Sequence, residues 1–296
     1  MTLRPRLAAG SALLSLALTP LVTRAEGPAT AGDPWERLPG ILEGIRAPTF
    51  PDRDFPVTAF GAVADGRTDA SAAFRAAIEA CHRGGGGRVV VPPGVFLTGP
   101  IHLKSRVNLH VSEGATIRFS RDPAAYLPIV LTRWEGVELM GYSPLVYAYG
   151  QQDIAVTGKG TLDGQADAEH WWPWKKNGHP QSQKPDRDRL FAQAEAGVPV
   201  AERVFGAGHY LRPQFVQPYR CTNVLIEGVT ITNAPMWVIH PVLSRNVIVR
   251  GVRVVSSGPN NDGCDPESST DVLIEDTLFD TGDDCIAIKS GRNADG

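Results

Sequence analysis

The stretch Asn223-Val224-Leu225-Ile226-Glu227-Gly228-Val229-Thr230-Ile231 recurs twice further along the chain. It returns as Asn246-Val247-Ile248-Val249-Arg250-Gly251-Val252-Arg253-Val254, and again as Asp271-Val272-Leu273-Ile274-Glu275-Asp276-Thr277-Leu278-Phe279. The first residues of the three copies are 23 and 25 residues apart. Each copy holds short runs of β-branched residues broken by a glycine or a polar residue, which is typical of short strands joined by tight turns.

Weaker copies precede these three. One begins at Asp153 and a fainter one at Asn108, 45 residues earlier, a separation that we interpret as two coils of the repeat. A single unit cannot bury its apolar side alone, whereas stacked neighbours can. The repeat therefore predicts an all-β fold, a right-handed parallel β-helix (solenoid). A leucine-rich repeat is the main alternative, and it is disfavoured because no fixed leucine lattice is present and no helix follows each strand.

The segment before the repeats contains a helix signal. Asp69 can cap a helix over residues 70–82, whose apolar side carries Phe74, Ala77, Ile78 and Cys81. Residues 88–91 predict a strand. We expect the helix to cover the open N-terminal end of the solenoid, where unpaired strand edges would otherwise lie.

Composition limits the class of protein. The chain has 296 residues of which 42% are hydrophobic, enough for one sizeable core. A formal net charge of −3 gives no basic field, so we expect no nucleic acid partner. We expect a monomer.

Residues 1–25 have the pattern of a signal peptide. Arg4 and Arg6 precede an apolar run over residues 7–22, and Thr23-Arg24-Ala25 offers a cleavage site. A short membrane anchor is the alternative, but the run is short for a spanning helix. We expect a secreted or periplasmic protein with no membrane contact after cleavage. Residues 26–55, rich in proline, glycine and charge, predict a linker or lead-in, and residues 56–296 the β-helix catalytic domain.

Residues 165–215 interrupt the repeat. The interruption contains Trp171-Trp172-Pro173-Trp174-Lys175-Lys176, followed by a charged stretch that ends near Arg212. One interpretation is a long loop that lines a sugar-binding groove with aromatic and basic groups. The other is an insertion whose tryptophans pack on the solenoid wall and whose lysines are solvated. The sequence leaves both open, and it also leaves Arg212 open between a sugar contact and a surface charge.

Two acidic clusters fall one repeat apart: Asn260-Asn261-Asp262-Gly263 and Gly282-Asp283-Asp284-Cys285. Stacked coils would bring Asp262, Asp283 and Asp284 onto one surface, since neighbouring strands lie about 4.8 Å apart. Carboxylates that close cannot all ionise at their usual pKa, so one can hold a proton near neutral pH. A protonated acid beside ionised bases is what cleavage of a glycosidic bond requires.

Two other interpretations of the clusters remain. Asn-Asp-Gly and Gly-Asp-Asp are ordinary turn sequences. Three carboxylates could also bind calcium, as a lyase acting on uronates would need. Cys264 and Cys285 are 21 residues apart and could stack on adjacent coils, where we expect two buried free thiols rather than a bridge.

The chain resembles the polygalacturonases of glycoside hydrolase family 28, which share a pectin-lyase-like β-helix. Matching stretches are Phe60-Gly61-Ala62 with Asp65-Gly66 and Thr68-Asp69, Thr161-Leu162-Asp163-Gly164, the two acidic clusters, and Ile288-Lys289-Ser290-Gly291. The two acidic clusters are the specific part. The resemblance implies that Asp283 is the general acid, that Asp262 and Asp284 activate water, that the anomeric carbon is inverted, and that no metal or other cofactor takes part.

The resemblance also marks departures. The family has Asn-Thr-Asp where this chain has Asn261 in the middle, which changes no carboxylate. Lys289 and His240 are candidate substrate-binding residues, although a solvated lysine and a structural histidine are the alternatives. The family's Gly-His-Gly and Arg-x-Lys motifs have no counterpart before Gly296, so we expect a chain truncated at its C-terminus.

The functional hypothesis is hydrolysis of α-1,4-galacturonosyl bonds in pectin or oligogalacturonides. A non-catalytic carbohydrate-binding β-helix or inactive fragment is the second hypothesis, and a calcium-dependent pectate lyase is the third. Endo or exo action and the kind of pectin stay open.

Overall fold

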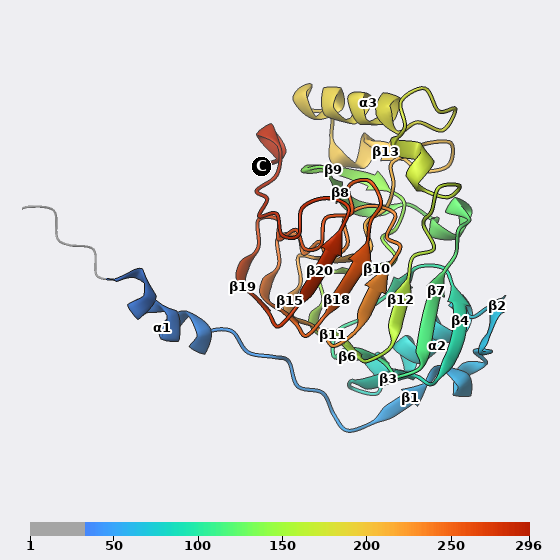
Figure 1. The fold of residues 1–296 in the computed structure, drawn as a ribbon, viewed down its shortest axis with the longest axis vertical. Coiled ribbons are helices and arrows are strands. Elements are labelled where there is room, and N and C mark those ends of the chain that lie inside the picture. The colour runs from blue at the N-terminus through green and yellow to red at the C-terminus, as the bar shows by residue number, and fades with distance from the viewer. Residues whose placement is uncertain (1–32) are drawn as a thin grey trace, which may run out of the picture. The chain divides into compact units, whose positions relative to one another are not determined.

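A computed structural model describes residues 33–296 (Figure 1). The predicted signal peptide lies outside the described residues and stays a prediction. Among the described helices, none is long and apolar enough to cross a membrane. A short unit that ends at Leu38 contains the 3₁₀ helix η1 (Pro34–Arg37), and residues 39–296 form a second unit.

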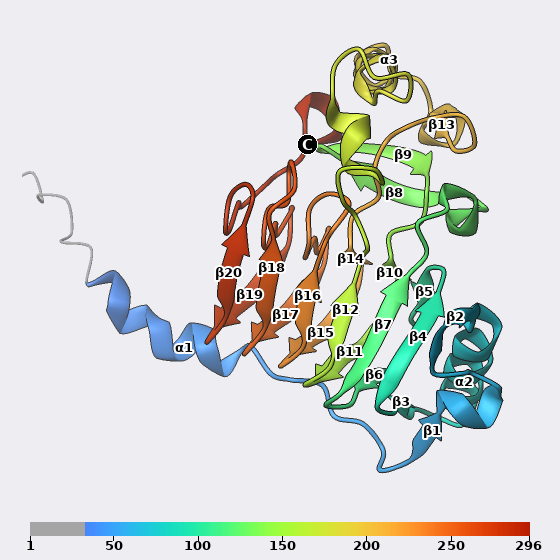
Figure 2. The same ribbon diagram turned by 45° about the vertical axis from the view of Figure 1, so that its right-hand side comes forward.

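The second unit is built from coils whose strands pair in parallel with the strands of the next coil (Figures 1 and 2). Sheet 1 contains, in spatial order, β1 (Asp54–Pro56), β3 (Gly87–Val91), β6 (Val107–Val111), β11 (Gln152–Gly158), β15 (Thr222–Glu227), β17 (Arg245–Arg250) and β19 (Thr270–Glu275). Sheet 2 contains β2 (Asp65–Asp69), β4 (Gly94–Thr98), β7 (Ala115–Phe119), β12 (Thr161–Asp163), β16 (Thr230–Thr232), β18 (Arg253–Ser256) and β20 (Leu278–Thr281).

Two smaller sheets complete the strand set. Sheet 3 contains β14 (Val216–Tyr219), β10 (Val146–Tyr149) and β5 (Ile101–His102), and sheet 4 contains β13 (Val204–Phe205), β9 (Val137–Gly141) and β8 (Val130–Trp134). The helical elements are α1 (Leu38–Glu43), η2 (Val57–Phe60), α2 (Ser71–Arg83), η3 (Pro123–Tyr126), η4 (Trp172–Lys175), α3 (Lys184–Glu195), η5 (Val200–Glu202) and η6 (Asn293–Asp295). The predicted all-β parallel solenoid is confirmed.

The repeat that opens at Asn223, Asn246 and Asp271 is in register in sheet 1. Val224 pairs with Val247, which pairs with Val272. The opening residues have left-handed φ angles of 58°, 54° and 56°, which asparagine and aspartate tolerate better than other residues with a side chain. Asn246 also donates from Nδ2 to Oδ1 of Asn223 at 2.8 Å. The Asn or Asp that the three copies share at their first position therefore fixes where each coil turns into sheet 1.

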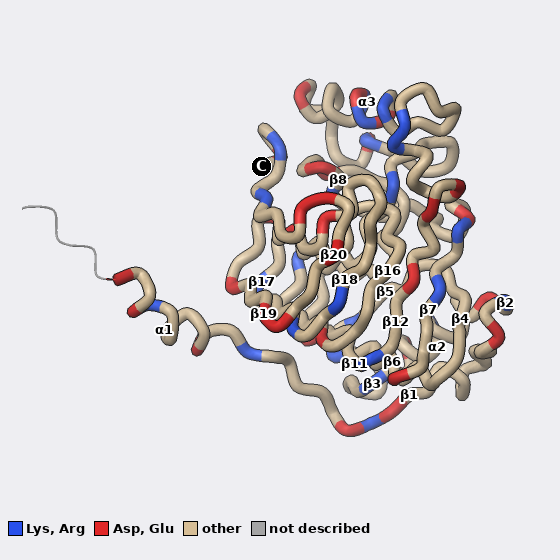
Figure 3. The backbone as a smooth tube through the Cα atoms, viewed as in Figure 1, with Lys and Arg blue, Asp and Glu red and all other residues tan. Residues whose placement is uncertain are grey.

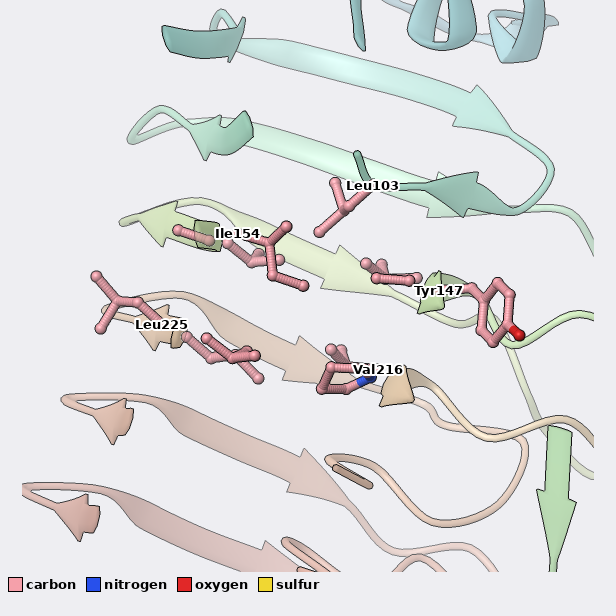
Figure 4. A pocket seen from close by; sticks show the side chains of 12 residues that line it. Leu103, Tyr147, Ile154, Val216 and Leu225 are labelled. Carbon is pink, nitrogen blue, oxygen red and sulfur yellow. The ribbon is translucent and has the colours of Figure 1, made fainter. Parts of the chain in front are cut away.

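Successive residues of a sheet 1 strand face opposite sides. Val224 and Ile226 point into the main core, whereas Leu225 packs in an outer cluster with Ile248. Figure 4 shows a hollow between sheets 1 and 3, lined by Leu103, Ile154, Val216 and their neighbours. None of the lining residues is charged, and the hydroxyl of Tyr147, which is one of them, donates to the backbone oxygen of Leu131 at 2.6 Å. This hollow is part of the core and offers no chemistry.

The lead-in is attached to the solenoid wall after α1. Ile45 and Phe50 pack against the outer cluster of sheet 1. The backbone N–H of Arg46 donates to Asn246 Oδ1 at 3.0 Å, and Asn246 Nδ2 donates back to the Arg46 oxygen at 2.7 Å. These contacts shield apolar residues on the outer side of the sheet that would otherwise face water.

The N-terminal helix α2 packs against η2, β1 and β3, as expected for a cap. Phe74, Ala77, Ile78 and Cys81 are buried, and the predicted bounds differ by one residue. The predicted cap is corrected in detail: Ala70 occupies the cap position, and Asp69 instead accepts from the Ser71 N–H at 2.9 Å.

The interpretation of the 45-residue gap as two coils is wrong. β6 and β11 are direct neighbours, with Leu109 paired to Val156, so the gap is a single coil. The coil is long because the antiparallel hairpin β8–β9 leaves it and returns. The next coil contains the insertion over residues 165–215, which carries α3 and β13 and packs beside the hairpin (Figure 2).

Candidate active site

The three aspartates come from turns that follow sheet 2 on adjacent coils. Asp262 lies beyond β18, and Asp283 and Asp284 lie beyond β20. The Gly263 N–H donates to the backbone oxygen of Asp284 at 2.9 Å, which fixes the two turns side by side. One carboxylate oxygen from each of the three residues lies within 4.8 Å of the others. Figure 3 shows acidic stretches, in red, in this part of the chain.

The three carboxylates have different surroundings. Asp262 is buried, with 4% of its surface exposed, whereas Asp283 and Asp284 are exposed. Burial raises the pKa of Asp262, the nearby charge of Lys289 opposes the rise, and the charge of Asp283 adds to it. The predicted cluster therefore forms, with Asp262 buried in the solenoid wall and Asp283 and Asp284 exposed on its surface.

Lys289, predicted as a substrate contact, belongs to this cluster. Its Nζ lies 3.4 Å from Asp262 Oδ2 and 4.2 Å from the centroid of the Trp237 ring. Burial lowers the pKa of Lys289, but the carboxylates of Asp265 and Asp262 outweigh burial and the net direction is upward. Lys289 is therefore a charged group beside the three acids, with part of its side chain open to solvent.

Asp265 is a member of the cluster that sequence reasoning missed. It has no exposed surface, and its Oδ1 lies 3.4 Å from Lys289 Nζ. Burial, followed by the charge of Asp262, raises the pKa of Asp265 to about 8. The signal was present, because Asp265 follows Asp262 by three residues in the same acidic turn.

His240 does not lie on the surface. It has no exposed area, its Nε2 lies 2.7 Å from Glu267 Oε2, and its Nδ1 lies 3.0 Å from Gln217 Nε2. Burial lowers the pKa of His240 against the opposing effect of Glu267. Since both ring nitrogens have protein partners, the prediction that His240 binds substrate is corrected: it is a structural histidine.

Asn261 has a structural role as well. Its Oδ1 accepts from Ser256 Oγ at 2.6 Å and from the Gly258 N–H at 2.9 Å, and its Nδ2 donates to the oxygen of Ala234 at 3.1 Å. The residue is fully buried. It ties the turn of one coil to the previous coil, so that Asp262 follows at a fixed place.

The tryptophans of the insertion pack into the wall. Trp171 and Trp174 are buried, and Trp172 is partly buried and donates from Nε1 to the oxygen of Ala234 at 2.9 Å. Lys175 and Lys176 are exposed. These observations favour the packing interpretation for Trp171 and Trp174.

The expected stacking of Cys264 on Cys285 is wrong. Cys264 bridges to Ile286, one residue further along the chain. Because neighbouring residues of an extended chain face opposite sides, Cys264 is buried and Cys285 is exposed. Both are free thiols, but only one is buried.

The carboxylate set could hold a hard cation, since each of the three aspartates offers an oxygen. However, the Lys289 ammonium already lies beside the buried member, Asp262, and supplies positive charge there. The arrangement of the three carboxylates supports acid–base chemistry, and the Lys289 side chain offers a positive charge to an anionic ligand.

The stacked coils define a right-handed parallel β-helix protein, and the cluster of Asp262, Asp283 and Asp284 gives it a site for acid–base chemistry. Residues 207–295 match glycosyl hydrolases family 28, and residues 55–112 match a family described as rhamnogalacturonase A/epimerase, pectate lyase-like. Residues 207–295 therefore carry a glycosyl hydrolase family 28 domain.

Similar proteins agree with this family. A probable polygalacturonase from Vitis vinifera is 30% identical over 244 residues, which are 78% of this chain and 43% of the relative. An exo-poly-alpha-D-galacturonosidase from Dickeya chrysanthemi is 30% identical over 264 residues, 81% of this chain and 42% of the relative. A hyperthermoactive exopolygalacturonase from Thermotoga maritima matches with a TM-score of 0.85 and 58% identity, over 88% of this chain and 60% of that structure. The chain spans less than half the length of the two curated relatives.

Proposed function

We propose that the protein hydrolyses α-1,4-galacturonosyl bonds of pectin. The observation that carries the proposal is the set of three carboxylates, with oxygens within 4.8 Å of one another, in the turns of adjacent coils. Asp283, on the surface, protonates the glycosidic oxygen of the leaving sugar. Asp262 and Asp284 hold the attacking water and accept its proton.

The surroundings of Asp262 support its role as a base. A carboxylate whose pKa is raised by burial binds a proton more strongly than an exposed one, and Lys289 keeps a positive charge beside it. We propose inversion at the anomeric carbon. The rule that links carboxyl separation to stereochemistry concerns two groups on opposite sides of the sugar ring, and the three acids here come from one wall.

A uronate substrate is supported by Lys289 and by the names of the relatives. Lys289, whose side chain is partly open to solvent beside the acids, can pair with the carboxylate of galacturonate. Because the chain is 58% identical to an exopolygalacturonase, we propose exo action, which releases small products from chain ends.

The test is the release of reducing ends from polygalacturonate by the protein. We expect Asp283→Asn to reduce turnover by about 10²-fold or more, because the proton donor is lost. Asp276→Asn is the matched control: it makes the same change at an exposed turn of the same coil and should leave turnover within about twofold. Equal activity of Asp283→Asn and the wild type would remove Asp283 from the mechanism.

The same assay separates the alternatives. A calcium-dependent lyase would produce an unsaturated product that absorbs in the ultraviolet and would stop in the presence of a chelator. Binding of polygalacturonate with no product would indicate a carbohydrate-binding protein. Early release of monomer or short oligomers, with little loss of viscosity, is the result that exo hydrolysis predicts.

We also infer that the protein is exported. Arg4, Arg6 and the apolar run over residues 7–22 support this inference. The N-terminal residue of the protein recovered from the periplasm or the medium tests it, with cleavage expected near Ala25.

A further inference from the structure

Arg212, at the end of the insertion, is a buried cation with four neutral acceptors. None of its surface is exposed. Its Nε donates to Gln183 Oε1 at 2.8 Å, and its Nη1 donates to the oxygens of Pro235 at 2.8 Å and Pro259 at 2.7 Å. Its Nη2 donates to Asn260 Oδ1 at 2.8 Å. Within residues 33–296, no carboxylate makes a hydrogen bond or ion pair with this guanidinium.

Such a side chain is expensive to bury, because a charge loses its hydration and neutral acceptors replace it only in part. Burial lowers the pKa of Arg212 to about 10, which still leaves it charged near neutral pH. Its acceptors belong to the insertion and to the turns that follow β16 and β18. Arg212 therefore joins three segments at the turn that carries Asp262.

The contact with Asn260 sets the direction of an amide group. A guanidinium has only donors, so the oxygen of the Asn260 side chain must face Arg212 and its NH₂ must face the other way. On that side, Asn260 Nδ2 lies 3.5 Å from Asp283 Oδ2. The chain of contacts runs from the insertion through Arg212 and Asn260 to the surface acid.

We propose that Arg212 is a positioning residue for the acidic site, which acts by fixing the Asn260 amide so that its NH₂ group holds the Asp283 carboxyl in place. The inference rests on the proposed function, since it assigns a role for the proton donor of that reaction. It gives the insertion a catalytic purpose: the segment that interrupts the repeat supplies Arg212 and its partner Gln183, which fix the turn next to the acid.

Two substitutions of Asn260 test the amide. Asn260→Asp keeps an oxygen toward Arg212 but offers Asp283 no donor, and Asn260→Gly removes the side chain without adding charge. Glycine also tolerates the left-handed backbone of this position, where φ is 55°. We expect both variants to lower kcat by about tenfold or more with KM within about twofold, because the acid is misplaced while the binding groups remain.

Asn223 is the matched control. It has a φ of 58° and donates from Nδ2 to Asp153 Oδ1 at 2.7 Å, which is the same kind of contact between coils at the start of β15, away from the acidic turns. Asn223→Asp and Asn223→Gly should leave kcat within about twofold. A general loss of stability from breaking such a contact would affect both positions alike in thermal unfolding.

Arg212→Lys tests the connection. Lysine keeps the charge but cannot reach four acceptors, so it should lower kcat as the Asn260 variants do. If Arg212 acts through Asn260, the two substitutions remove the same interaction. The kcat of the double variant Arg212→Lys with Asn260→Gly should then lie within about twofold of the kcat of the less active single variant. Effects that multiply would overturn the connection, and unchanged kcat in Asn260→Gly would overturn the proposal.

Crystal structures of the wild type and of Asn260→Gly compare the position of the Asp283 side chain directly. This comparison needs no activity measurement, and it does not require that Arg212→Lys folds. We expect the Asp283 side chain to leave its wild-type rotamer when the amide is absent. An Asp283 rotamer that is the same in both structures would overturn the inference. If the wild type releases nothing from polygalacturonate, the proposed function fails, and the rotamer comparison alone decides this inference.

Discussion

Nζ of Lys289 lies 3.4 Å from Oδ1 of Asp265, a carboxylate with no exposed surface. Neither oxygen of Asp265 has a hydrogen-bond partner within residues 33–296. The Lys289 ammonium is therefore the group that compensates the negative charge of Asp265 when this carboxyl group ionises. The same ammonium lies 3.4 Å from Asp262 Oδ2. A single lysine therefore couples a buried acid to the proposed catalytic base.

Asp265 should make stability depend on pH. Burial raises its pKa to about 8 in the folded protein, against about 3.9 in the unfolded chain. The folded state then binds the extra proton between these values, so the stabilisation is present at low pH and is lost as pH rises toward about 8. We expect the free energy of unfolding to fall by up to ~1.4 kcal/mol per pH unit in this window.

Asp265→Asn isolates that effect, because an amide does not titrate. Urea unfolding of wild type and variant from about pH 5 to about pH 8 should give a steeper decline for the wild type. Parallel curves would show that Asp265 titrates at an ordinary value.

Lys289→Gln should weaken the site in two ways. The uronate loses a cation, and Asp262 loses the charge that compensates it. We expect kcat/KM on oligogalacturonides to fall by about tenfold to 10²-fold, in line with about 1.5–3 kcal/mol for a hydrogen bond to a charged group. Lys175→Gln, at an exposed lysine of the insertion, is the control and should match the wild type. Equal kinetics of the two variants would remove Lys289 from the site.

The coil register could be predicted where the repeat is short and unbroken. The copies at Asn223, Asn246 and Asp271 pair as their alignment indicates. The number of coils between the copies at Asn108 and Asp153 was predicted wrongly, because the hairpin β8–β9 lengthens that coil and the spacing no longer counts coils. A period in sequence measures stacked coils only where no segment leaves the solenoid.

The sequence predicted those residues of the site that belong to the two acidic clusters. Asp262, Asp283 and Asp284 come together as expected. Arg212 was left undecided, because its acceptors lie in three segments that only the folded chain brings together. For His240, the sequence left substrate binding and a structural role open, because its burial depends on Gln217 and Glu267 from two other coils.

The four cysteines should react differently with an alkylating reagent. Cys81, Cys221 and Cys264 are buried, and burial raises the pKa of Cys81 and of Cys221 to about 11 and that of Cys264 well above its usual value. Cys285 is exposed. Since the thiolate is the reactive form, brief treatment of the native protein with iodoacetamide should label Cys285 alone. Peptide mass spectrometry checks this, and label on a buried cysteine, or none on Cys285, would contradict it.

Gly258 has no side chain, and this leaves the space in which the Trp172 ring of the insertion packs against the segment that leads to Asp262. A Cβ there would come within 2.2 Å of Trp172 Cε2, and Trp172 is held by its 2.9 Å hydrogen bond to the Ala234 oxygen. Gly258 is four residues before Asp262, so a displaced Trp172 would also disturb that turn. We expect Gly258→Ala to destabilise the protein by about 1–3 kcal/mol and to lower turnover. Gly40→Ala is the control, because a Cβ at Gly40 meets nothing within 4 Å. Calorimetry on both variants checks the steric cause: a lower Tm is expected only for Gly258→Ala, and an unchanged Tm there would mean that the Trp172 side chain moves aside freely.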